Sequence, residues 1–124
     1  MDSILTSIKK LLGLGVEDTN FDEELVMHIN SVLFTLTQIG VGPATGFSIL
    51  TSEETWEDYL GWDPIPQELE PVKMYIYLKV RLSFDPPSSS FVLESIQRQI
   101  SELEFRINLH VEPAPPIVET VEEE

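Results

Sequence analysis

The side chains of this chain that could support chemistry are two histidines, one cluster of carboxylates and one run of serines. His28 and His110 are far apart in the sequence, and neither has the patterned cysteine or carboxylate of a metal site, so we expect structural roles for both. Catalysis by paired carboxyl groups requires their burial beside a cleft. No pattern favours such a cleft here, and we expect a solvated surface at the cluster formed by Glu53, Glu54, Glu57 and Asp58.

The other reactive patterns lack their partners as well. The serines at 88–90 have no partner base, and the glycines at 40, 42 and 46 lack the lysine and the serine or threonine of a phosphate-binding loop. The chain contains no cysteine, which excludes thiol chemistry and sulfur-ligated zinc. We therefore expect no enzymatic activity, no cofactor and no bound metal, and we expect the function to lie in the protein's surfaces.

The composition indicates one acidic domain. The chain has 124 residues, with 22 acidic and 7 basic side chains and a formal net charge of −15. This balance disfavours general binding to nucleic-acid phosphates and to anionic membranes, and it suits basic partners or a passage that must not hold DNA. No export signal is visible, because Lys9 and Lys10 follow the first apolar residues instead of preceding them.

One long segment carries no charge at all. From Leu25 to Ser52 the sequence contains no Asp, Glu, Lys or Arg. Polar residues interrupt its apolar positions and Gly40 ends the predicted helix early, so a membrane span is not expected. An uncharged helix in so acidic a chain indicates a helix with little solvent around it.

Apolar periodicity predicts an all-α fold: a small bundle of four to five helices with a long C-terminal helical hairpin. The expected helices cover residues 3–12, 22–39, 51–60, 72–82 and 91–107. We expect Gly40 to end the second helix, a capping box over 51–54 to open the third, and a short extended piece over 47–50. The hairpin turn is placed at 85–90, where two prolines stop the first arm and a serine can cap the second.

The two arms of the hairpin differ in their surfaces. The first arm, 72–82, is apolar on almost every side, which predicts a helix wrapped by neighbours. The second arm has an apolar seam at steps of three and four, comprising Leu93, Ile96, Ile100, Leu103 and Ile107. Its outer side predicts three ion pairs at steps of four, through Glu94, Arg98, Glu102 and Arg106.

Two helices have apolar residues outside their main seam. Phe91, Arg98 and Phe105 are seven apart, on the side of the last helix opposite its seam. Met27 and Phe34 likewise lie opposite the main apolar row of the second helix, which comprises Leu25, Ile29, Val32, Leu36 and Ile39. Each group is either covered by the rest of the same chain or forms a contact with another chain.

The C-terminal segment differs from the rest. We divide the chain into a helical domain, residues 1–110, and an acidic proline-rich tail, residues 111–124, which holds five glutamates, three prolines and no base. Such a tail does not fold alone. Ile117, Val118 and Val121 could dock in extended form on a neighbour, and the alternative is a disordered, solubilising end.

The order and spacing of several segments resemble a known family. These segments are 7–13 (SIKKLLG), 27–32 (MHINSV) with 40–43 (GVGP), and 72–82 (VKMYIYLKVRL) running into 84–87 (FDPP). Together they are similar to the head–tail connector (adaptor, or head completion) proteins of tailed bacteriophages. The resemblance covers roughly residues 3–110 and leaves the tail outside it.

The resemblance implies a structural virion protein without catalytic residues. It implies a homo-oligomeric ring, commonly a dodecamer, that binds the portal protein at the neck of the virion. This ring extends the DNA channel, lets DNA pass without specific binding, and docks the stopper or tail-completion protein. It also implies assembly in the host cytoplasm and no membrane association.

Two other functions are compatible with the composition. An acidic DNA mimic would inhibit a nucleic-acid-binding enzyme, which fits the charge of −15. However, the acids concentrate in turns, helix starts and the tail, and the second helix is uncharged. A regulatory binding module of the repressor or antitoxin type is disfavoured because no basic recognition helix is present.

Overall fold

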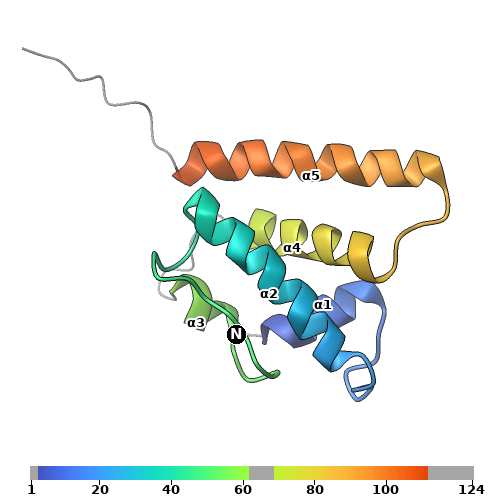
Figure 1. The fold of residues 1–124 in the computed structure, drawn as a ribbon, viewed down its shortest axis with the longest axis horizontal. Helices are drawn as coiled ribbons and strands as arrows, with labels where there is room; N and C mark the ends of the chain where they lie inside the picture. The colour runs from blue at the N-terminus through green and yellow to red at the C-terminus, as the bar shows by residue number, and fades with distance from the viewer. Residues whose placement is uncertain (1–2, 62–68, 112–124) are drawn as a thin grey trace, which may run out of the picture.

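The structure, a computed structural model, describes residues 3–61 and 69–111, and within them helices are its regular elements. The helices are α1 (Ile4–Leu12), α2 (Asp22–Ile39), α3 (Trp56–Leu60), α4 (Leu69–Phe84) and α5 (Ser90–Val111). A single isolated β-bridge joins Ser3 to Thr55 in these ranges. The predicted all-α bundle with a long C-terminal hairpin is therefore confirmed (Figure 1).

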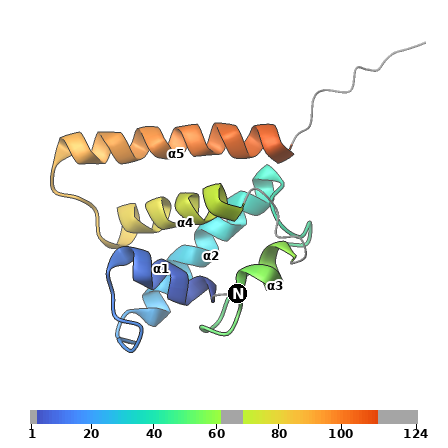
Figure 2. The ribbon, with the colours of Figure 1, turned by 180° about the vertical axis from the view of Figure 1, so that it is seen from behind.

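Helix α4 is the centre of the bundle. It packs against α1, α2 and α5, and both views place α5 along one side of it and α1 along the other (Figures 1 and 2). Its buried residues point in several directions around the helix, which explains why the sequence of the first hairpin arm is apolar on almost every side. Its buried side chains include Val72, Tyr75, Ile76, Leu78 and Val80.

Helix α2 has the predicted boundaries. Asp22, Glu23 and Glu24 occupy its first turn, where the positive end of the helix dipole favours anions. Gly40 ends it in the left-handed conformation with φ 112°, and its N–H bonds to carbonyls of the last turn. The predicted apolar row faces the core and is buried, except for the half-buried Ile39.

Helix α1 is anchored by two buried polar side chains. Lys9 is only 3% exposed, and its Nζ lies 3.1 Å from the carbonyl oxygen of Val16 and 2.8 Å from Asp22 Oδ1. Ser7 accepts a 2.9 Å hydrogen bond from Trp56 Nε1, which ties α3 to α1. These contacts hold the α1–α2 connection and the short helix α3 against the bundle.

The predicted capping box of the third helix is displaced. Thr55 caps α3, because its hydroxyl accepts from the N–H of Asp58 and the Asp58 carboxylate accepts from the N–H of Thr55. The box expected over 51–54 is wrong: there the Glu54 carboxylate instead accepts from the N–H groups of Leu50 and Thr51. Both four-residue segments have the same pattern of hydroxyl and acid, and the chain forms its helix only after the second.

The loop before α3 is held by side chains and contains no strand. Asn30 bonds to both backbone groups of Ile49, at 2.9 Å to its oxygen and 2.7 Å to its nitrogen, so the extended piece predicted over 47–50 is not a strand here. Gly42 has φ +81°, and a Cβ at this position would lie 2.5 Å from the ring of the buried Tyr59. Glycine is therefore required at this close approach.

The hairpin turn forms where the two prolines predict it. Helix α4 ends at Phe84 and α5 begins at Ser90, with Ser89 Oγ accepting from the N–H of Val92 at 3.4 Å. The arms are joined further along by Tyr75, whose hydroxyl donates to Glu104 Oε2 at 2.6 Å. Burial, reinforced by this carboxylate, raises the pKa of Tyr75 above its ordinary value of 10.0.

Candidate assembly surfaces

Helix α5 packs through a single side. Of the predicted seam, Ile96, Ile100 and Ile107 are buried, and Leu93 and Leu103 are half-buried. The rest of the helix faces outward, because α4 is its main neighbour in the described structure. Figures 1 and 2 show α5 at the edge of the bundle with its far side uncovered.

The aromatic residues on the outer side of α5 are uncovered. Phe91 is 74% exposed and Phe105 is 64% exposed, and Arg98, midway between them, is exposed too. We name these three residues the α5 patch. Within the described residues no carboxylate pairs with Arg98, so its guanidinium is available to a partner.

Helix α2 has a second uncovered side. Met27 is 63% exposed and Phe34 is 64% exposed, and the exposed Ser31 and Gln38 continue the same row along the helix. We name these four residues the α2 patch. It contains no charged side chain, in a protein whose net charge is −15.

The two patches face different directions. Helix α2 lies nearest the viewer in Figure 1 and behind α4 in Figure 2, whereas α5 lies along the upper edge in both views. The core of the subunit is already complete between the helices, with Leu25, Ile29 and Tyr75 among its fully buried members. The large apolar side chains of both patches therefore stay exposed on the surface of the single subunit.

The structure also shows where the sequence-based expectations for charged residues were wrong. Of the three ion pairs expected along α5, only Glu102–Arg106 forms within this described helix, at 2.6 Å. His28, for which a structural role was expected, lies 3.4 Å from Glu24 Oε2 on the preceding turn. The side chain of His110 lies outside the described part of the structure, as do the tail residues Ile117, Val118 and Val121.

The acids of the loop and α3 act in local structure. Burial raises the pKa of Glu54, but the hydrogen bonds from the backbone amides of Leu50 and Thr51 outweigh it, and the net shift is downward. Asp58 completes the cap of α3. No group of three or more potential metal ligands forms among the described residues, and no described helix is long and apolar enough to cross a bilayer.

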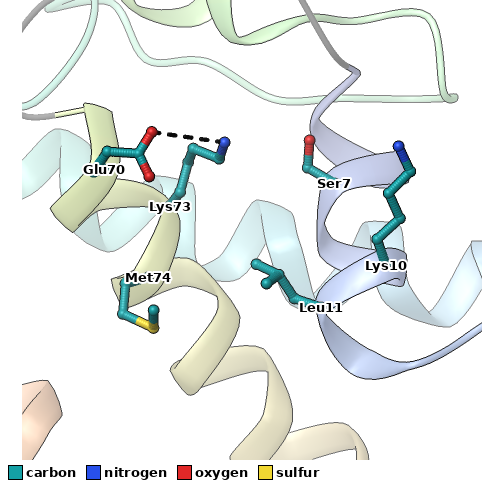
Figure 3. Close-up of a pocket in the computed structure, with 6 residues that line it drawn as sticks. All are labelled: Ser7, Lys10, Leu11, Glu70, Lys73 and Met74. Carbon is teal, nitrogen blue, oxygen red and sulfur yellow. Dashed lines mark ion pairs between the residues drawn. The ribbon is translucent and has the colours of Figure 1, made fainter.

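A pocket lies between α1 and α4 that the sequence did not predict. It has a volume of about 240 Å³ and is lined by side chains of both helices (Figure 3): Ser7, Lys10, Leu11, Glu70, Lys73 and Met74. Leu11 lies on α1 between the apolar residues Ile8 and Leu12, yet it is 44% exposed, because it points into this open pocket. No signal in the sequence distinguishes such a residue from a core leucine.

Comparison with known proteins now identifies the family. A family model described as "Phage connector protein" matches residues 4–114, which include every described helix. Neither the curated proteins nor the solved structures contain a match to the chain. The resemblance seen in the sequence is therefore confirmed, and this chain belongs to the phage connector protein family.

Proposed function

We propose that this protein forms a closed ring of identical subunits, a dodecamer, that binds the portal protein at the virion neck, extends the DNA channel and docks the stopper or tail-completion protein. As a phage connector protein it has a structural role in joining head and tail of the particle. We propose four features beyond this family role: ring formation, the copy number, the extended DNA channel and the docking of the stopper or tail-completion protein.

The observation that supports a ring is the pair of uncovered patches on different sides of the subunit. A ring of identical copies needs two different, complementary surfaces on each subunit, so that the contacts repeat head to tail until they close. The α2 patch and the α5 patch have this character, since each presents large apolar side chains and the two face different directions. We propose that Met27 and Phe34 of one subunit contact Phe91, Arg98 and Phe105 of the next.

The charges support the proposed channel. A wall with net negative charge repels the phosphates of passing DNA and so gives it no binding site. The basic side chains number 7 in the whole chain, and Lys9, one of them, is buried in an ion pair. We propose that the ring exposes its acids to the DNA and its uncharged patches to neighbouring subunits.

We further propose that the helical domain, residues 1–110, builds the ring and that the tail, residues 111–124, is an accessory arm. The family match ends at residue 114 and so includes only the start of this tail. Truncation after His110 is expected to leave the helical fold and the portal-binding ring intact.

The test is negative-stain microscopy of the protein mixed with the portal protein of the same phage. We expect rings seated on the portal, with co-sedimentation of the two proteins at physiological salt. The proposal would be overturned if the protein stays a stable monomer and does not bind the portal protein. Salt-sensitive binding to a DNA-processing enzyme would then indicate a DNA mimic.

A further inference from the structure

The pocket between α1 and α4 adjoins another pocket at Met74, and we name the two together the α1–α4–α5 groove. A second pocket, of about 210 Å³, lies between α4 and α5 and is lined by Gln99, Glu102, Leu103 and Arg106. Met74 lines both pockets and is 40% exposed. Leu11, Met74 and Leu103 therefore give the groove an apolar floor that runs across three helices.

The groove is also where the protein gathers its few bases. Of the 7 basic residues in the chain, three line the groove: Lys10, Lys73 and Arg106. Lys73 Nζ is 4.0 Å from Glu70, and Arg106 pairs with Glu102. Lys10 is exposed, and no carboxylate among the described residues forms an ion pair with it. An occupant with apolar side chains and a carboxylate for Lys10 would match this lining.

The chain itself contains a segment with that chemistry. Residues 117–121 (IVETV) place three apolar side chains around Glu119, and three further glutamates end the chain. An extended segment that docks by its side chains is a common form of peptide recognition. The apolar residues would cover Leu11 and Met74, and a glutamate would meet Lys10.

We propose that the C-terminal tail of a neighbouring copy docks in this α1–α4–α5 groove, with Ile117, Val118 and Val121 on its apolar floor. The proposal rests on the proposed ring, because the ring brings the neighbour's tail within reach. Fully extended, residues 112–124 span about 40 Å, which is longer than the width of a small domain. The docked tail would link each subunit to the next without using the α2 patch or the α5 patch.

The tail's sequence favours a neighbour over its own subunit. Three prolines at 113, 115 and 116 lie between the end of α5 and Ile117. Prolines favour a stiff, extended chain of about 3 Å per residue, which opposes a tight reversal directly after the helix. Such a chain would carry the apolar residues away from the groove of their own subunit.

Disulfide trapping in the full chain tests the docking directly, because the chain has no cysteine of its own. One variant carries Leu11→Cys in the groove, and a second carries Val118→Cys in the tail. The two variants have affinity tags of different size, so that a mixed dimer is distinguished on a gel from a dimer of either variant alone. The control for the first is Thr45→Cys, an exposed position in the loop between α2 and α3 that belongs neither to the two patches nor to the groove. The variants are mixed with portal protein, and mixed disulfide dimers are counted on gels while rings are counted by microscopy.

We expect mixed dimers with Leu11→Cys to form about tenfold faster than with Thr45→Cys, because docking raises the local concentration of the tail thiol. Lys10→Glu added to the Leu11→Cys variant should slow this trapping. Intact rings with equal trapping at both positions would overturn the docking and leave the ring standing. Absence of rings would overturn the proposed function and the docking together. An internal disulfide in the Leu11→Cys/Val118→Cys double variant, without mixed dimers, would assign the groove to the subunit's own tail.

Discussion

Replacement of Phe105 by aspartate gives a measure of how much the α5 patch contributes to assembly. The side chain is 64% exposed in the subunit, so a neighbour can cover most of it. A phenylalanine offers about 200 Å² in all, which leaves about 130 Å² for the neighbour to bury. At about 25 cal/mol per Å², this area is worth about 3 kcal/mol in each interface of the proposed ring.

A loss of about 3 kcal/mol weakens the association of two subunits about 150-fold. The fold should be almost unaffected, within about 0.5 kcal/mol of unfolding free energy, because the residue makes little contact within its own subunit. Circular dichroism and urea denaturation measure the fold, and analytical ultracentrifugation with the portal protein measures the assembly. Phe105→Ser separates the lost area from the added charge, and Gln97→Asp adds the same charge at an exposed position off the patch.

Two results would refute the reasoning. Normal ring formation by Phe105→Asp would show that the α5 patch is not an interface between subunits. Equal impairment by Gln97→Asp would show that charge repulsion between copies, and not the area of the phenyl ring, controls assembly.

Three further predictions concern the subunit itself, each measured by urea denaturation followed by circular dichroism. Lys9→Met should cost about 1–3 kcal/mol of unfolding free energy, because it leaves a partly buried carboxylate without its cation; an unchanged midpoint would show that the pair is not stabilising. Gly42→Ala should cost about 2–4 kcal/mol, since it adds a clash to the backbone strain, whereas Gly46→Ala, also at positive φ but in open space, should cost only about 1 kcal/mol; equal costs would contradict the clash. The raised pKa of Tyr75 means that its contribution to stability is complete below its ordinary value of 10.0 and is lost as the pH rises above it, so Tyr75→Phe should flatten the alkaline fall in stability; parallel profiles for the two proteins would assign that fall to other groups.

The helices that the sequence predicts best are those whose ends carry unambiguous local signals. Helix α2 ends at Gly40 because only glycine adopts the left-handed cap without cost, and the turn at 85–89 follows from two prolines. The apolar seam of α5 was predictable for a similar reason. Because α5 packs mainly against one helix, α4, its apolar residues lie on one side at steps of three and four. In these places local chemistry and the tertiary structure agree.

The predictions failed where two segments have the same local sequence pattern and tertiary contacts determine which of them forms the predicted structure. Thr51 and Thr55 each precede an acid three residues later, and only the second caps a helix, because Trp56 must enter the core beside Ser7. Likewise, Leu11 is an apolar residue of α1 that lines an open pocket, and only the tertiary arrangement of α1 and α4 decides this. The burial of Lys9 depends on a carbonyl and a carboxylate that come from the following segment, so helix periodicity could not predict it.

The distribution of charge connects the fold to assembly. Subunits with a charge of −15 repel one another, and this repulsion grows when copies are brought into a ring. Salt at physiological strength screens charges over about 8 Å, so acids beside an interface would still oppose contact. The described helix without charge after its first turn, α2, is also the one whose outer row of Met27, Ser31, Phe34 and Gln38 is open to a neighbour. Because the acids lie outside α2 after its first turn, the α2 patch is able to meet another copy while the acidic remainder of the surface repels DNA.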